Sequence, residues 1–93
     1  MTQQYLIGQF SVLLEELQPS PSDGLAGAVQ ELRREVECAS LAMLPKLASE
    51  AIGLTDMICW AALERGDAAD FSRCGKAAVA LGDFTDSAGL LRP

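Results

Sequence analysis

An all-α fold is what this sequence predicts, on three observations. Apolar residues recur at steps of three and four along most of the chain, which places them on one face of a helix. No stretch of four or more residues alternates between apolar and polar in the manner of a strand. Valine, isoleucine and threonine, which favour strands, are sparse. Because the helices are of similar length and their connections are short, we expect an antiparallel up-down four-helix bundle.

The first predicted helix covers residues 3–17. Its apolar stripe consists of Leu6, Phe10, Leu13, Leu14 and Leu17. A Pro/Ser cluster at 18–22 then indicates a turn, since it is too short to link domains. Ser20 suits the capping position of a second helix, Pro21 its first helical position and Asp23 its first turn.

The second predicted helix covers residues 21–44. Its apolar positions have the alternating four- and three-residue spacing that is typical of helices packed side by side: Leu25, Val29, Leu32, Val36, Ala39 and Met43. Pro45 lacks an amide donor and disfavours a helical conformation in the residue before it. We therefore expect a break near Leu44 and a third helix over residues 45–65.

The third helix has the broadest apolar face, which indicates a central position in the bundle. The main face consists of Leu47, Ala51, Leu54, Ile58 and Ala62, and the flanking residues Ile52, Cys59 and Leu63 widen it. Gly66 can adopt the left-handed conformation that ends a helix, and Asp67 with Asp70 resembles a capping box.

The fourth helix is therefore expected over residues 67–88. Its inward positions are predicted to be Phe71, Cys74, Ala78, Leu81, Phe84 and Ala88. Gly82 weakens the prediction for the last turns, because glycine is a poor helix former. From Gly89 onward we expect the helix end to fray.

The whole chain, residues 1–93, is predicted to form one domain. Its length suits a single core, and 49% hydrophobic with 22% charged residues is ordinary globular usage. A chain this short buries only about 60 to 65% of the surface that its unfolded form exposes. Association with a second copy would add stability, so we expect a homo-oligomer, with a dimer as the simplest form.

The charge of the chain argues against two classes of partner. The net charge is −6 and no basic cluster exceeds Arg33-Arg34, so the phosphates of nucleic acids would be repelled. The same repulsion disfavours an anionic membrane, and no apolar run approaches the roughly 18 to 20 residues that span a bilayer. The first residues lack the positive charge of a secretory signal, so we expect a cytoplasmic protein.

The absence of histidine removes most of the chemistry that small helical bundles perform. It excludes histidine phosphorelay, Ser-His-Asp and Cys-His catalysis, and Glu-x-x-His di-iron sites. Cys38, Cys59 and Cys74 are too few and too widely spaced for a structural zinc site or a CxxC motif. Carboxylate pairs such as Asp67 and Asp70 fall at capping or solvent positions. We therefore expect no enzyme, no cofactor and no metal.

Asp23-Gly24-Leu25 resembles the Asp-Ser-Leu motif at which acyl carrier proteins attach phosphopantetheine, and those proteins are acidic helical bundles of this size. Gly24 stands where that family has its serine. The connection before this position is also shorter than the long first connection of the carrier family. Without the hydroxyl there is no attachment point, so no function is carried over from the family.

Candidate contact residues are those that helical geometry places away from the main stripes. They are Tyr5, Val12, Arg34, Cys38, Leu41, Met57 and Trp60. Aromatic and methionine side chains beside a polar rim are favoured at protein interfaces. The alternative is that the bundle itself encloses these side chains.

Two functions remain open. The first is a non-enzymatic intracellular interaction module that self-associates through helix surfaces or binds another protein. The second is a helical bundle that binds an apolar small ligand or an acyl group in a cavity. The residues predicted to line such a cavity are Phe10, Leu32, Ile58, Trp60 and Phe71.

Overall fold

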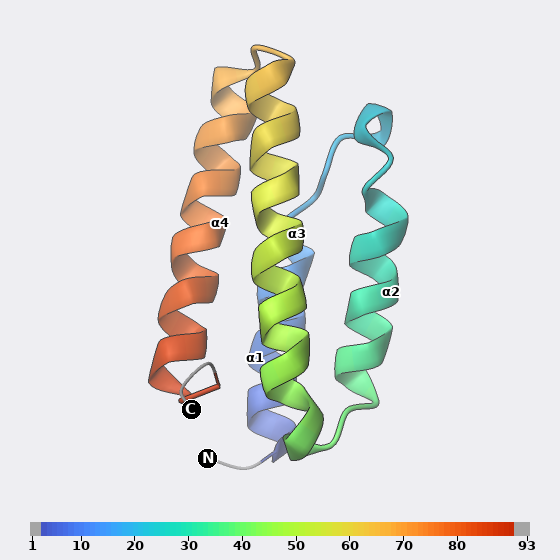
Figure 1. Cartoon of the computed structure of the whole chain (residues 1–93), viewed down its shortest axis with the longest axis vertical. Coiled ribbons are helices and arrows are strands. Elements are labelled where there is room, and N and C mark those ends of the chain that lie inside the picture. Colours follow the sequence, from blue (N-terminus) through green and yellow to red (C-terminus); the bar gives the residue numbers. More distant parts are fainter. Residues whose placement is uncertain (1–2, 91–93) are drawn as a thin grey trace.

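The computed structural model describes residues 3–90, which form a bundle of four α-helices (Figure 1). The helices are α1 (Gln3–Glu15), α2 (Ala26–Glu37), α3 (Leu44–Glu64) and α4 (Ala68–Ser87), with 3₁₀ turns η1 (Pro21–Asp23) and η2 (Leu41–Met43). This described part of the chain contains no strand. The prediction of an all-α four-helix fold is confirmed.

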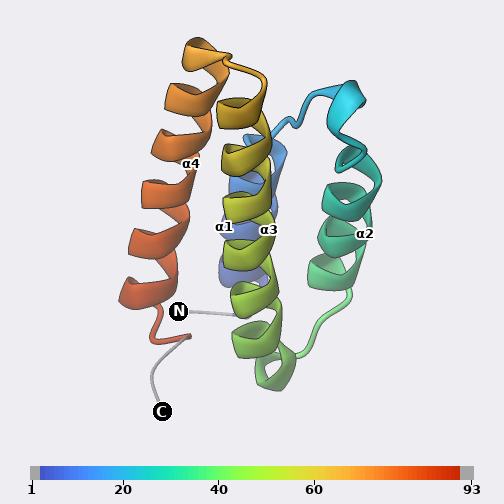
Figure 2. The same ribbon diagram turned by 45° about the horizontal axis from the view of Figure 1, so that its top comes forward.

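The two longest helices, α3 and α4, lie side by side as a helical hairpin in both views (Figures 1 and 2). In Figure 1 the chain passes up α1, down α2, up α3 and down α4. Both α1 and α3 pack chiefly against α2 and α4, so α1 and α3 occupy diagonal positions and their outer faces point to opposite sides. The molecule measures 40 × 22 × 20 Å.

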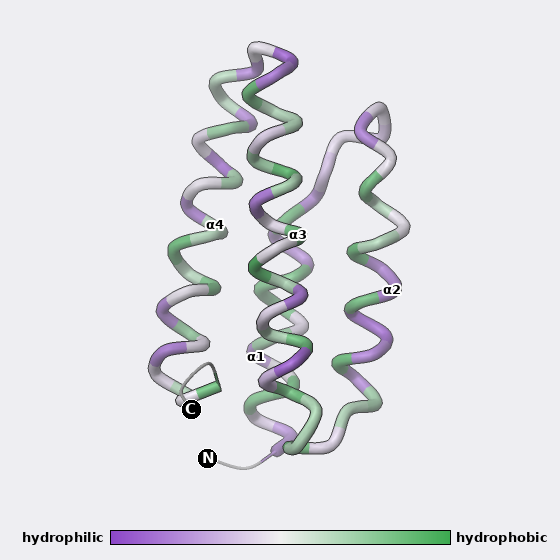
Figure 3. The backbone as a smooth tube through the Cα atoms, in the orientation of Figure 1, coloured by the Kyte–Doolittle hydropathy of each residue, from purple (hydrophilic) through white to green (hydrophobic). Residues whose placement is uncertain are grey.

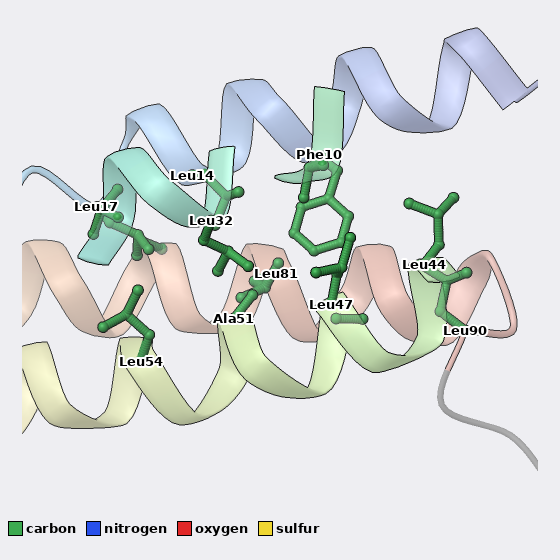
Figure 4. Close-up of a cluster of buried hydrophobic side chains, with 14 of the residues drawn as sticks. Phe10, Leu14, Leu17, Leu32, Leu44, Leu47, Ala51, Leu54, Leu81 and Leu90 are labelled. Atoms are coloured by element: carbon green, nitrogen blue, oxygen red, sulfur yellow. The ribbon is translucent and has the colours of Figure 1, made fainter. Parts of the chain in front are cut away.

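Every helix contributes one apolar face to the core. Figure 3 shows hydrophobic and hydrophilic stretches alternating along each helix, and Figure 4 shows leucines from all four helices, with Phe10, in the space between the helices. All five residues predicted as the main face of α3 are buried, which confirms that prediction. Burying a leucine or isoleucine side chain contributes about 1.5 to 3 kcal/mol, so this face makes a substantial contribution to stability.

The helix predicted over residues 21–44 is wrong, because the structure divides it into η1, α2 and η2. The chain turns at residues 38–40, and Ser40 is extended with ψ 165°. Ala39 and Leu44 are five residues apart and both buried. On one helix they would lie about 140° apart and could not both face the core, so the chain reverses between them. Pro45 lies in the first turn of α3, as expected of the residue that opens the third helix, but the break in the helix comes earlier, at residues 38–40.

The predicted boundaries of the first two helices also shift. Helix α1 ends at Glu15, although Leu17 beyond its end is still buried. Ser20 precedes η1 in extended backbone, but its side chain makes no capping bond and its hydroxyl instead bonds that of Ser22 at 3.0 Å. Met43, predicted to continue the stripe of the second helix, is 48% exposed because Leu44 takes the inward position.

The turn between α3 and α4 confirms the sequence prediction. Gly66 has φ +73°, and the amides of Gly66 and Asp67 donate to the carbonyls of Leu63 and Ala62 at 3.0 and 3.1 Å. The Asp67 side chain accepts a bond from the Asp70 amide at 3.0 Å. These bonds satisfy backbone groups at the end of one helix and the start of the next.

The end of α4 repeats this arrangement and corrects the predicted fraying. Gly89 has φ +69°, and the Leu90 amide donates to the Thr85 carbonyl at 2.9 Å. Leu90 is buried against the core. The prediction of fraying is therefore wrong for Gly89 and Leu90, and its remaining part, residues 91–93, lies outside the described residues. Gly82 does not interrupt α4.

Arg73 of α4 holds the end of α1. Its guanidinium donates to the carbonyls of Glu16, Leu17 and Gln18 at 2.9, 3.0 and 2.8 Å. Gln18 has φ +30°, a backbone conformation that side-chain-bearing residues rarely adopt. The three bonds stabilise this turn, which directs the chain from α1 toward α2.

Arg65 at the end of α3 connects the same region to η1. It forms salt bridges with Asp23 in η1 and with Asp70 in α4, and the Asp23 side chain is only 6% exposed. Asp70 also pairs with Arg73 at 2.5 Å. Hydrogen bonds from Arg73, and then from Arg65, hold the pKa of the Asp70 carboxyl below its ordinary value. The network joins η1, α3, α4 and the end of α1.

Substitution of two glycines by alanine should change stability in opposite directions. A Cβ at Gly82 meets nothing within 4 Å, so Gly82→Ala should stabilise the fold by about 0.5 to 1 kcal/mol through helix propensity. Gly66→Ala should destabilise it by about 1 kcal/mol, because alanine is strained at positive φ. Urea unfolding of the two variants measures both effects. If both substitutions changed the free energy of unfolding by the same amount in the same direction, the role given to Gly66 would be contradicted.

Asp70→Asn should lower stability at neutral pH and lower it less in acid. The pKa of Asp70 is depressed in the folded state, so its contribution is fully present above the unfolded pKa of about 3.9 and is lost as the pH falls through the lower folded pKa. Urea unfolding at about pH 6 and about pH 3 measures the difference in the free energy of unfolding between the wild type and the variant. This difference should be smaller at the lower pH.

Glu50→Gln is the control for this measurement, since Glu50 is an exposed acid on α3 that takes part in none of the salt bridges above. If the loss of unfolding free energy caused by Asp70→Asn is the same at both pH values, the Asp70 charge does not stabilise the fold.

Candidate functional site

A groove of about 730 Å³ lies between α1 and α4. Its apolar lining consists of Tyr5, Gly8, Val12, Leu13, Ala80, Phe84 and Ala88, and its polar lining of Gln4, Gln9, Asp83 and Ser87. The groove exists because α1 and α4 pack against each other over fewer residues than α3 and α4 do. We call it the α1/α4 groove.

The floor of the α1/α4 groove rests on an aromatic pair. The rings of Phe10 and Phe84 meet edge to face, with centroids 5.6 Å apart and planes at 65°. Phe10 is fully buried in the core, while Phe84 is partly exposed toward the groove. The core therefore holds the floor in a defined position.

The rim on α1 consists of two projecting side chains with a gap between them. Tyr5 and Val12 are 52% and 53% exposed and, being seven residues apart, lie two turns apart on the same face. Gly8 lies between them, and a Cβ there would meet nothing within 4 Å. Gln9 donates from Nε2 to the Tyr5 hydroxyl at 3.0 Å and so orients the ring.

The α1/α4 groove is almost free of charge. Residues 3–14 contain no charged side chain, and Asp83 is the one charged residue among those that line the groove. The rest of the chain is strongly acidic, with a net charge of −6. An apolar surface of another molecule, including a second copy of this chain, can thus approach the groove with little electrostatic repulsion.

All seven residues predicted as interface residues are exposed, but they lie in three separate places. Tyr5 and Val12 line the α1/α4 groove. Arg34, Cys38 and Leu41 lie between the last turn of α2 and η2. Met57 and Trp60 lie on the outer face of α3. The alternative that the bundle encloses these side chains is wrong, since Trp60 is 63% and Leu41 50% exposed.

The outer face of α3 is a second exposed surface, which we call the Trp60 face. It consists of Gly53, Asp56, Met57, Trp60, Leu63 and Glu64, all of them exposed. Leu63 and Phe71 were predicted to face inward but are 49% and 41% exposed. Both lie beside the Gly66 turn, where the α3/α4 hairpin extends beyond α1 (Figure 1). That end of the hairpin has no third helix to cover it.

The residues predicted to line a ligand cavity do not gather around one. Phe10, Leu32 and Ile58 are buried in the core, whereas Trp60 and Phe71 are exposed, and none of the five lines the α1/α4 groove. None of the groove residues on α4, among them Ala80 and Phe84, was predicted as a site residue. The uncharged stretch at residues 3–14 is the sequence signal that could have indicated this face.

Two of the cysteines lie near each other across the α3/α4 hairpin. Burial is the main cause that raises the pKa of both the Cys59 and the Cys74 thiol, and the neighbouring Cys74 raises that of Cys59 further. Cys74 is fully buried and Cys59 partly exposed, whereas Cys38 is exposed. All three are free thiols. Within residues 3–90 no group of three or more acidic, cysteine or histidine side chains is placed to hold a metal ion.

The three thiols should react with a disulfide reagent such as Ellman's reagent in a fixed order. Cys38 should react first because it is exposed, Cys59 more slowly, and Cys74 last because its sulfur is buried and its raised pKa disfavours the reactive thiolate. Stopped-flow absorbance of the folded protein, with Cys38→Ser as the comparison, resolves the phases. A Cys38→Ser variant that keeps the fast phase would contradict the assignment.

None of the helices within residues 3–90 is long and apolar enough to cross a membrane. Comparison of the chain with protein-family models, with curated proteins and with solved structures finds no match. The chain's own residues, above all those of the α1/α4 groove and the Trp60 face, are therefore the basis for its function.

Proposed function

We propose that this chain is a non-enzymatic interaction module that forms a homodimer through the α1/α4 groove. The observation that supports this most is an apolar groove with a single charged residue in a chain of net charge −6. Two copies that approached through other faces would bring carboxylates together. At the groove, apolar contact is opposed by little more than the two copies of Asp83.

The shape of the groove suits a second copy of the same surface. In a two-fold symmetric dimer both subunits use the same patch, so the patch must be complementary to itself. Each side chain that projects from it must fit a recess in the same patch of the partner. Tyr5 and Val12 project from α1, and Gly8 between them leaves room for a partner's side chain. Projections two turns apart beside a recess are the elements of knobs-into-holes packing.

Size also favours self-association. A monomer of 93 residues has a small core and leaves a large part of its apolar side chains in water. Tyr5 and Val12 are about half exposed in the single chain. Dimerisation would remove them from water at a surface whose floor is already ordered by the Phe10 and Phe84 rings.

An intracellular location is part of the proposal. The three cysteines are an odd count without the close spacing of a disulfide framework, which favours reduced thiols. Free thiols persist in reducing compartments such as the cytoplasm, whereas oxidising compartments favour disulfides. The exposed thiol of Cys38 is consistent with the same environment.

A second function has one observation in its favour. The groove volume of about 730 Å³ falls within the range of small-molecule sites, roughly 300 to 1,000 Å³. An acyl chain or another apolar ligand could lie along Gly8 against the Phe84 ring. This alternative uses the same groove as the dimer, so one set of variants separates the two.

Val12→Lys should convert the dimer to a monomer. Val12 is 53% exposed in the single chain, so the fold tolerates lysine, but in the dimer the ammonium would be buried in an apolar contact. We expect the dimer dissociation constant to rise by at least about tenfold. Light scattering or sedimentation velocity measures the mass, and circular dichroism checks that the helix content is unchanged.

Val79→Lys is the matched control, because Val79 is 65% exposed on α4 and does not line the groove. The control should remain dimeric. A wild-type protein that stays monomeric at high concentration would contradict the dimer, and saturable binding of a fluorescent fatty-acid analogue, abolished by Gly8→Leu, would then support the ligand-binding alternative. Dissociation by both lysine variants would show that the groove is not the interface.

A further inference from the structure

We infer that the Trp60 face docks a basic amphipathic helix of another protein. The face lies on the outer side of α3, opposite the helix that carries the proposed dimer surface (Figure 1). It would remain accessible in both subunits of such a dimer. The inference depends on the residues of α3 alone and holds whether or not the chain dimerises.

The apolar part of the Trp60 face spans two turns of helix. Met57, Trp60 and Leu63 are 55%, 63% and 49% exposed and recur every three residues, which keeps them on one side of α3. Tryptophan is the residue type most often found among the strongest contributors to protein interfaces. A ring that is largely exposed to water in the single chain gains most from being covered by a partner.

Gly53 extends this face by one turn toward the start of α3. It is exposed, and a Cβ there would meet nothing within 4 Å, so no contact within the described chain requires a glycine at this position. Glycine lowers helix stability by about 0.5 to 1 kcal/mol relative to alanine. Beside Met57 and Trp60, it leaves space in which a partner helix can approach the α3 backbone closely.

Negative charge brackets the tryptophan. Asp56 lies one turn before Trp60 and Glu64 one turn after it, and both are exposed. The salt bridges of the described residues involve neither acid. The partial negative charge at the carboxyl end of α3 adds to the field around Glu64. Lysine or arginine residues that flank an apolar stripe would complement this pattern.

The basic residue closest in sequence, Arg65, does not neutralise this field. Its side chain points to Asp23 and Asp70 and is used in the network that holds η1. The one base within α3 is Lys46, at the opposite end of the helix. The Trp60 face is therefore apolar at its centre and acidic at its edges.

A second copy of this chain does not supply the matching surface. Three of its described bases, Arg33, Arg65 and Arg73, are engaged in salt bridges. The remaining three lie on three different helices: Arg34 on α2, Lys46 on α3 and Lys76 on α4. No described helix of this chain thus presents a row of bases beside an apolar stripe, so the occupant is a different protein.

Fluorescence of Trp60 measures the docking directly, because it is the single tryptophan of the chain. The probe is a synthetic tryptophan-free peptide of leucines and lysines that forms a helix with leucines on one face. We expect saturable binding with a shift of Trp60 emission to shorter wavelength, as the ring leaves water, and weaker binding as salt is added. A peptide of the same composition in scrambled order and one with glutamate for lysine are the controls.

Two variants with equal change of charge test the acidic edges. Asp56→Asn with Glu64→Gln should weaken peptide binding by about three- to tenfold at low salt. Glu31→Gln with Glu35→Gln removes the same charge from exposed positions on α2 and should leave the affinity unchanged. Met57→Ser keeps the reporter and should weaken binding at all salt concentrations, because it removes apolar contact.

The inference is overturned if the amphipathic peptide produces no shift, if the scrambled peptide binds equally well, or if both charge variants behave alike. A shift of Trp60 emission produced by phospholipid vesicles, without peptide, would assign the face to a membrane surface and would likewise overturn it. Light scattering of the same samples reports the dimer separately. Failure of the proposed dimer is thereby distinguished from failure of this docking site.

Discussion

Burial of one face of α3 is the constraint on which the rest of the structure depends. Eight residues of this helix are buried, more than in any other described helix, and they contact a core to which all four helices contribute (Figure 4). A helix that gives one side to the core must expose the other. The position of Trp60 on the outer surface follows from the burial of Ile58 and Ala62 on the inner one.

Length differences between the helices determine where the bundle is open. Helices α3 and α4 have 21 and 20 residues, whereas α1 and α2 have 13 and 12, so the short pair cannot cover the hairpin along its whole length. Arg65 and Arg73 compensate at the uncovered end, where they hold η1 and the last residues of α1 in place through Asp23, Asp70 and backbone carbonyls. The remaining exposed apolar groups form surfaces rather than core.

Charge separates those surfaces into two kinds. The exposed side of α1 is neutral over residues 3–14, while the exposed side of α3 carries Asp56 and Glu64 around its tryptophan. A neutral apolar groove and an acid-edged apolar face favour different partners, since like charges repel and the chain as a whole is acidic. One small bundle in this way presents two exposed apolar surfaces of different charge on opposite sides.

The sequence by itself determined the features that depend on residues close together along the chain, namely the helices, their apolar faces and one turn. Apolar spacing predicted four helices and the buried face of α3, and Gly66 with Asp67 predicted the turn after it. Only the tertiary structure decided the turn at residues 38–40, the proximity of Cys59 to Cys74, and the groove that Tyr5 shares with Phe84. These features join residues that are distant along the chain or depend on how helices of unequal length pack, and helical periodicity describes one helix at a time.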